Sequence, residues 1–192
     1  MNYDLLTFRY FNNLAGNNLG LDYLGIFLAD YLPYLVIIFL FVSFLWFKKE
    51  RLKNIIMFSV AFSSGLIARF IVKSFILIFY QRPRPYVALQ SVHKLISMSP
   101  GENWQSFPSG HAIFFFALAT AVYFNNKKLG WSLIIISVVI GMTRVFVGVH
   151  YPSDIIAGAS LGVLTAFLIQ KLYLKWHNAI DKILKKVFFL LI

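Results

Sequence analysis

The chain has no cysteine and few charged residues. Charged residues make up 13% of its 192 residues and hydrophobic residues 59%, and the mean hydropathy is +0.73. A soluble domain is about half apolar and about one quarter charged, so this composition excludes an ordinary soluble protein. The lack of cysteine excludes disulfide bonds and thiolate metal ligands. The four histidines and seven acidic residues are too scattered to predict a metal site. We expect one integral membrane domain over residues 1–192, without metal or cofactor.

Acidic residues are scarce, and the 18 basic residues produce a formal net charge of +11. The basic residues collect in short tracts beside apolar runs, at residues 48–53, 127–128 and 171–186. Such tracts are typical of the cytoplasmic loops of multi-pass membrane proteins. No basic patch lies on a soluble domain, which argues against nucleic acid as a partner. We therefore expect membrane lipids around the chain and these tracts on the cytoplasmic side.

Long hydrophobic runs predict an all-α bundle that crosses the membrane. A hydrocarbon core of about 30 Å requires about 20 apolar residues per helix. Asp22 and Asp30 disfavour a span early in the chain, so we expect residues 1–30 to form a peripheral, partly amphipathic segment. Residues 176–192 alternate Lys with apolar residues and predict an interfacial tail. The sequence favours five spans, with six as the alternative: residues 34–47 with the apolar stretch before them, 55–80, 112–124, 129–149 and 155–174.

Two glycines in the last predicted span, Gly158 and Gly162, are four residues apart among other small residues. Small residues at this spacing let two helices approach closely. The pattern predicts either close packing within one bundle or the face of a homodimer.

Two polar clusters stand at the ends of apolar runs. Pro108-Ser109-Gly110-His111 opens the third run, and Arg144, His150 and Asp154 close the fourth. If the basic tracts face the cytoplasm, residues 81–107 and 149–154 lie on the opposite side. Polar groups at such a boundary are costly and usually functional. We therefore expect the active site at the outer membrane–water interface, with Arg82 and Arg84 beside the same clusters.

These residue types suit the transfer of a phosphoryl group without a metal. The reaction requires a nucleophile, positive charge around the phosphate oxygens and an acid for the leaving oxygen. His150 is the candidate nucleophile, oriented by Asp154 one helical turn later, and His111 is the candidate acid. The candidate phosphate ligands are the Ser109-Gly110 turn, whose helix N-terminus favours anions, and three guanidinium groups, namely Arg82, Arg84 and Arg144.

The clusters resemble two of the three sequence blocks of the type 2 phosphatidic acid phosphatase superfamily. Residues 108–111 match its Pro-Ser-Gly-His block, and residues 143–154 match its third block, with Thr143 in place of Ser. The resemblance implies that His150 forms a phosphohistidine, that His111 is the acid and that Asp154 is the partner of His150. It also implies a phosphate-binding role for Arg84, Arg144, Ser109 and Gly110.

The first block departs from the family pattern of Lys, six residues, then Arg-Pro. Leu77 or Phe75 stands where the lysine is expected. Lys73 lies one helical turn before Leu77 on the same face, and its long side chain is a candidate replacement. Arg82 is the alternative source of the missing charge, and Arg69 lies one turn deeper than Lys73.

Further residues resemble bacterial undecaprenyl-diphosphatases of the bacitracin-resistance type. They are Arg84–Ala88, Val92-His93, Ser106–Ser109 and His150-Tyr151-Pro152. This resemblance implies undecaprenyl diphosphate as substrate, cut on the outer face of the bacterial cytoplasmic membrane, with His93 as a substrate-loop candidate. Open alternatives are a phosphatidylglycerophosphate or phosphatidate phosphatase, a lipid phosphotransferase, and a non-catalytic lipid binder or transporter. Each implies an isoprenoid or glycerophospholipid phosphate as partner.

Overall fold

The computed structural model describes residues 3–46 and 51–190, and within these ranges the regular structure is helical. The Lys48-Lys49 part of the first basic tract lies outside the described residues. A single isolated bridge, between Arg82 and Gln105, is the extended pairing within the described ranges. The elements in chain order are α1 (Tyr3–Asn12), α2 (Leu19–Ile26), η1 (Phe27–Tyr31), α3 (Leu32–Trp46), α4 (Arg51–Leu66), η2 (Ile67–Val72), α5 (Lys73–Phe79), α6 (Pro85–Ala88), η3 (Pro100–Glu102), α7 (Gly110–Asn125), α8 (Lys127–Phe146) and α9 (Pro152–Leu190).

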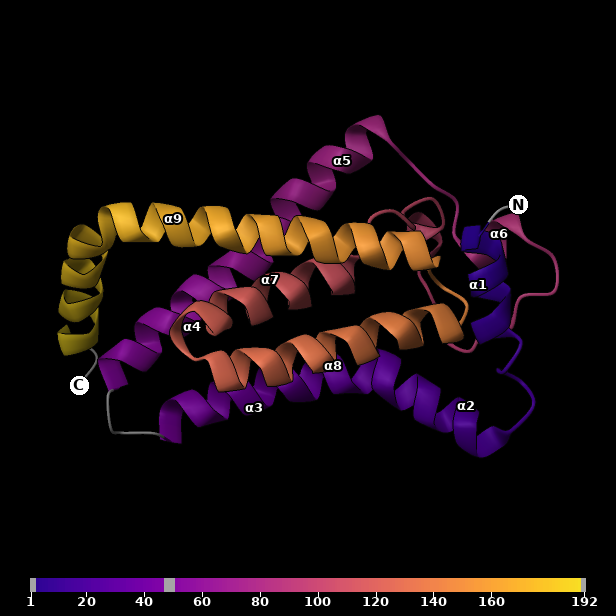
Figure 1. Ribbon diagram of the computed structural model, residues 1–192, viewed down its shortest axis with the longest axis horizontal. Helices are drawn as coiled ribbons and strands as arrows, with labels where there is room; N and C mark the ends of the chain where they lie inside the picture. Colours follow the sequence, from indigo (N-terminus) through magenta and orange to yellow (C-terminus); the bar gives the residue numbers. More distant parts are fainter. Residues whose placement is uncertain (1–2, 47–50, 191–192) are drawn as a thin grey trace.

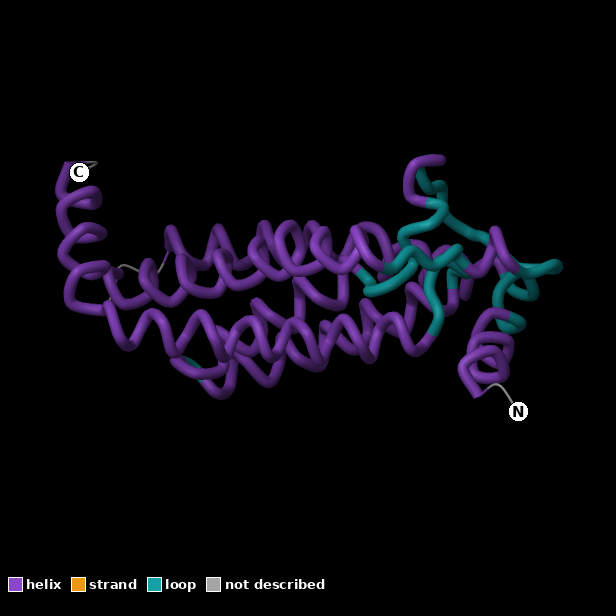
Figure 2. The backbone as a smooth tube through the Cα atoms, turned by 90° about the horizontal axis from the view of Figure 1, so that it is seen from above, coloured by secondary structure: helices purple, strands orange, loops and turns teal. Residues whose placement is uncertain are grey.

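Helix α7 is the centre of the bundle, and it packs against α4, α8 and α9. Its sequence is apolar on every side, which is typical of a fully buried helix, and eleven of its 16 residues are buried. The long helices run side by side, while the loops, α1 and α6 gather at the end where α7 begins (Figures 1 and 2). The polar loops and the N-terminus of α7 therefore share one end of the molecule.

In the part of the chain that the structure describes, four helical runs are long and apolar enough to cross a membrane, and α7 is a shorter apolar helix of 16 residues. At 1.5 Å per residue α7 is about 24 Å long, so the predicted number of spans stays a prediction. The four runs are Leu19–Ser43, Lys53–Phe79, Lys127–Phe146 and Pro152–Ala179. The last run continues as helix beyond residue 179 and turns away from the bundle, and the interfacial position of this tail also stays a prediction (Figure 1).

The first run begins at Leu19 and continues as helix past residue 30. Asp22 and Asp30, which disfavoured a span in this part of the sequence, therefore lie within it. Both acidic residues find partners. Asp22 accepts hydrogen bonds from the Gly16 N–H, at 3.0 Å to Oδ1, and Asp30 Oδ1 lies 3.1 Å from Arg144 Nη1. An apolar helix tolerates acids that are paired in this way. The boundary at residue 30 was expected because unpaired acidic residues are costly in a membrane, and the pairing removes that reason. The position of the membrane relative to residues 1–30 is not given by these contacts, so the boundary remains a prediction.

The first helix, α1, crosses the loop end of the bundle. Phe8 is fully buried, and its ring centroid lies 5.6 Å from that of Tyr151. Asn12 is also fully buried; its amide nitrogen donates to the carbonyl oxygens of His93 and Phe146, and its Oδ1 accepts from the His93 N–H. Helix α1 is thereby fastened to the loops that carry the polar clusters.

The two glycines four residues apart are used inside one chain. A Cβ at Gly158 would lie 2.9 Å from Ala112 Cβ, and one at Gly162 would lie 2.5 Å from the Ile113 carbonyl oxygen. Glycine at both positions lets α9 pack directly on α7, which decides for packing within the bundle over a dimer face. This contact also brings the start of α7 next to the start of α9.

Candidate active site

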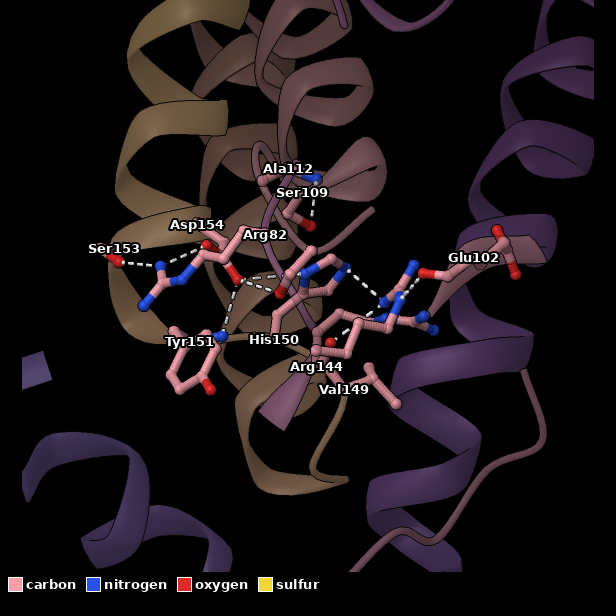
Figure 3. A network of polar contacts seen from close by, with 12 residues as sticks. Arg82, Glu102, Ser109, Ala112, Arg144, Val149, His150, Tyr151, Ser153 and Asp154 are labelled. Atoms are coloured by element: carbon pink, nitrogen blue, oxygen red, sulfur yellow. Dashed lines mark hydrogen bonds and ion pairs between the residues drawn. The ribbon is translucent and has the colours of Figure 1, made fainter. Parts of the chain in front are cut away.

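The two predicted polar clusters meet where α7 and α9 begin. The Ser109 N–H donates to the Asp154 carbonyl oxygen at 3.1 Å, and the Ser109 side chain caps α7. Between α8 and His150 the chain turns at Gly148, whose φ is +82° and where a Cβ would lie 2.5 Å from the His93 carbonyl oxygen. Only glycine fits this turn without strain. The turn sets His150 beside the Ser109 cap (Figure 3).

The protonation of His150 follows from its two neighbours. Its ring is buried, with Nε2 3.2 Å from Arg84 Nη1 and Nδ1 3.5 Å from Asp154 Oδ2. Arginine can only donate hydrogen bonds, so Nε2 is the acceptor and Nδ1 carries the hydrogen that faces the carboxylate. Burial and the Arg84 charge outweigh Asp154 and lower the pKa of His150 to about 3. The imidazole is therefore neutral, and its Nε2 lone pair points toward the Arg84 guanidinium.

Asp154 is fully buried and accepts hydrogen bonds from three donors. The Ser106 hydroxyl donates at 2.6 Å and the Tyr151 N–H at 2.9 Å to Oδ2, while Arg82 Nη1 donates at 2.7 Å to Oδ1. Hydrogen bonds to an ionised group are the strong ones. This carboxylate is thereby fixed in position beside Nδ1 of His150.

The Arg82 guanidinium binds two carboxylates of the protein, Asp154 and Asp4. Its second nitrogen, Nη2, donates to Asp4 Oδ2 at 2.7 Å, and its Cζ lies 3.8 Å from the Tyr151 ring centroid. Asp4 also accepts from the Ser153 N–H at 2.9 Å and the Ser153 hydroxyl at 2.6 Å. Both terminal nitrogens of Arg82 already donate to carboxylates, and its role as a phosphate ligand stays a prediction. Asp4 and Ser153 were not predicted, and no local spacing links them to Arg82.

The carboxylate Asp4 and its partner have shifted pKa values that agree with this pairing. Burial raises the pKa of Asp4, but the hydrogen bonds from Arg82 and Ser153 outweigh burial and lower it overall. Burial lowers the pKa of Arg82, but the neighbouring carboxylates Asp4 and Asp154 outweigh burial, so the pKa is raised overall. Both groups are therefore charged at neutral pH.

Arg84 and Arg144 are buried at the site. Arg84 Nε donates to the Glu102 carbonyl oxygen at 2.8 Å, and its Nη1 donates to the Val149 carbonyl oxygen at 3.0 Å. Arg144 pairs with Asp30 and contacts Met98, and its buried Nε has no hydrogen-bond partner within residues 3–46 and 51–190. Both guanidinium groups therefore lie at the candidate site, and their role as phosphate ligands stays a prediction.

Two more cations reach the same turn from η2 and α5. A Cβ at Gly110 would lie 2.8 Å from Arg69 Nη1 and 3.3 Å from Lys73 Nζ. His111 interacts electrostatically with Arg69 and Lys73, and also with Arg144 and His150. The structure thus brings Lys73 to the Ser109-Gly110 turn, as the departure in the first block suggested, and adds Arg69.

His93 lies apart from this cluster. Its ring contacts the loop after α1, where a Cβ at Gly16 would lie 2.6 Å from Nδ1, and its backbone is bound to Asn12. The structure gives His93 a place in the packing of this loop. The role of a substrate contact remains a prediction.

Residues 55–178 match a known protein family, the PAP2 superfamily. The chain belongs to this superfamily. The match confirms the family resemblance seen in the sequence blocks, and it covers both histidines and every predicted phosphate ligand. With its apolar helices, this PAP2 chain is a multi-pass membrane protein and a lipid phosphatase.

Individual relatives cover most of this PAP2 chain. Undecaprenyl-diphosphatase BcrC of Bacillus subtilis is 30% identical over 168 residues, which cover 88% of this chain and 82% of the relative. Bacitracin transport permease protein BcrC of Bacillus licheniformis is 33% identical over 163 residues, covering 85% and 77%. The crystal structure of Aquifex aeolicus LpxE superposes with a TM-score of 0.65 at 27% identity, covering 87% of this chain and 94% of that one.

Proposed function

We propose that this PAP2 phosphatase hydrolyses undecaprenyl diphosphate to undecaprenyl phosphate through a phosphohistidine. The observation that carries the proposal is the buried, neutral His150, whose Nε2 lone pair faces Arg84 while its Nδ1 lies 3.5 Å from Asp154 Oδ2. The substrate is suggested by the printed name of the Bacillus subtilis relative.

In the first step the Nε2 lone pair of His150 attacks the distal phosphorus in line. The bond from that phosphorus to the bridging oxygen breaks, and the lipid monophosphate leaves with a proton from His111. Arg84, Arg144 and the Gly110 N–H at the start of α7 bind the equatorial oxygens, with Lys73 beside them. The negative phosphate favours the protonated form of His111 that this step requires.

In the second step water replaces the leaving group. Neutral His111 takes a proton from the water, whose oxygen attacks the phosphorus, and the bond to Nε2 of His150 breaks. Inorganic phosphate leaves and the imidazole of His150 returns to its neutral form. Asp154 stabilises the imidazolium character that develops in both steps, while Arg82 and Ser106 hold Asp154.

We further propose that the site faces the outside of the cytoplasmic membrane. The support is the distribution of basic tracts along the sequence, which alternate with the polar loops that carry the candidate site residues. A membrane-impermeant histidine reagent added to intact cells should inactivate the enzyme under this orientation. Inactivation only after the cells are opened would contradict it.

The test of function is a substrate panel with purified protein in detergent. Undecaprenyl diphosphate, phosphatidylglycerophosphate and phosphatidate are compared by kcat/KM, with phosphate release as the readout. We expect the highest value for the diphosphate. H150A should reduce turnover by at least about 10³-fold and still insert and purify normally. Near-normal turnover in H150A would remove this histidine from the nucleophile role, and preference for a monophosphate would select the glycerophospholipid alternative.

A further inference from the structure

A groove on the side of the bundle leads to the active-site acid. It lies between α3 and the α4–η2 helix, with α7 as its floor, and its volume is about 270 Å³. Most of the lining is aliphatic or aromatic, and the charged or titratable exceptions near its inner end are Arg69 and His111. The lining includes Tyr34 on α3, Leu66 on α4, Arg69 on η2, and His111 and Phe115 on α7. Several of them belong to the candidate membrane spans, so the groove is positioned to face lipid.

Arg69 lines this groove, and Lys73 lies near it, beside the start of α7. Their head groups approach the same point, the missing Cβ of Gly110, at 2.8 Å and 3.3 Å. They come from one helical run, in which η2 is a π-helical segment and the Lys73 N–H donates to the Ala68 carbonyl oxygen. Such π-bulges occur often at functional sites. Here the bulge presents both cations to the start of α7.

The positive charge at this place exceeds the negative charge available from the protein. Among the described residues, neither Arg69 nor Lys73 forms an ion pair with a carboxylate, while Asp30 is paired with Arg144. Like charges gathered at a membrane boundary are unfavourable unless an anion joins them. Arg84, Arg144 and the Ser109 turn already suffice for one phosphate, so Arg69 is available for a second.

We propose that Arg69, next to Lys73, binds the phosphate that stays on the lipid, and that the groove holds the first part of its hydrocarbon chain. This inference rests on the proposed function. In-line attack places His150 and the leaving oxygen on opposite sides of the distal phosphorus. The acid His111 must reach the leaving oxygen, and His111 lines the groove. The lipid-bound phosphate then lies beside Arg69, and the chain leaves along the apolar lining.

The arrangement explains selectivity for diphosphates. A lipid monophosphate fills the distal site and leaves Arg69 without an anion, whereas a lipid diphosphate satisfies both. One charge-assisted hydrogen bond more for the diphosphate corresponds to about a tenfold to hundredfold preference. Arg69 is therefore the residue that determines this preference.

The experiment compares wild type, R69Q, R69K and K171Q by kcat/KM on undecaprenyl diphosphate and on phosphatidate. Lys171 is an exposed cation on α9 outside the site and is the matched control. We expect the diphosphate-to-phosphatidate ratio to fall about tenfold or more in R69Q, to be partly restored in R69K and to be unchanged in K171Q. An unchanged ratio in R69Q would overturn the second-phosphate subsite.

Two measurements keep the test decisive if R69Q does not fold. In the wild type, inorganic pyrophosphate should inhibit phosphatidate hydrolysis at a lower concentration than inorganic phosphate, and equal inhibition would contradict the subsite. L66W, which fills the groove, should raise KM for undecaprenyl diphosphate more than for the five-carbon isopentenyl diphosphate; an equal effect on both would remove the groove from chain binding. Wild type that cleaves no lipid diphosphate refutes the proposed function, whereas active wild type with an unchanged R69Q ratio refutes this inference alone.

Discussion

Replacing Arg82 tests whether this residue positions the candidate catalytic carboxylate, Asp154, or binds substrate. In R82Q, Asp154 loses the 2.7 Å hydrogen bond to its Oδ1 and keeps those from Ser106 and Tyr151 to Oδ2. Asp4 loses its guanidinium partner as well and keeps its contacts with Ser153. The perturbation therefore affects one fully buried carboxylate and one that is partly exposed.

The magnitude follows from the burial of each partner. The Asp154 side chain is 0% exposed and that of Arg82 is 22% exposed, so removing Arg82 leaves a buried charge short of one strong donor. Breaking a buried pair costs about 3–5 kcal/mol, and the two remaining donors place R82Q near the lower end, at about 3 kcal/mol. The Asp4 side chain is 21% exposed, so solvent screening reduces the effect of D4N to about 1 kcal/mol.

The assay combines unfolding in detergent with steady-state kinetics. If Arg82 acts through Asp154, R82Q should lower kcat by about tenfold to hundredfold while KM and inhibition by inorganic phosphate stay near the wild-type values. D4N should show the same pattern more weakly, and the double variant should be less than additive because both changes remove one network. R9Q is the control, since Arg9 binds the backbone carbonyl groups of Gln90 and Ser91 instead of a carboxylate. Normal stability in R82Q with a raised KM and weaker phosphate inhibition would show that Arg82 binds phosphate and would refute this reasoning.

Three further predictions concern pH, packing and metal. Because the pKa of His150 is lowered from 6.5 to about 3, the unfolded chain binds a proton that the folded chain does not within this range. Stability should therefore fall by up to about 1.4 kcal/mol per pH unit as pH drops from 6.5 toward 3, and H150Q should lose this component in pH-dependent unfolding; an identical slope would contradict it. G162A places a Cβ 2.5 Å from the Ile113 carbonyl oxygen and should cost about 1–3 kcal/mol, whereas G101A meets nothing within 4 Å and should be neutral, as measured by thermal unfolding. Equal stability of the two would speak against tight α7–α9 packing. Phosphate release should be unchanged in excess EDTA, and activity that returns only with an added divalent ion would refute metal-free chemistry.

Much of the site could be predicted because its members are close in sequence. His150 and Asp154 are four residues apart, and Ser109, Gly110 and His111 are adjacent at a helix start, so local geometry already relates their side chains. Apolar runs likewise predicted the helices of the bundle, since burial in lipid requires that composition. Hydropathy, spacing and family blocks were sufficient for the family and the class of chemistry, and they named the candidate catalytic residues that the fold brings together.

Hydropathy and sequence spacing could not predict which of the basic residues are paired with carboxylates and which lie at the Ser109-Gly110 turn. Arg82 stands beside Arg84 in sequence, yet its guanidinium is bound by Asp4 and Asp154, while Arg69 reaches Gly110 from a different helix.

The composition of the chain by itself determined a helical membrane protein, and its short-range motifs determined a phosphoryl-transfer site. Only the tertiary structure decided which charges are paired, as Asp30 with Arg144 shows for two residues 114 positions apart. The physical reason is that hydropathy and helical periodicity act over a few turns, whereas a charge selects its partner by distance in the folded molecule.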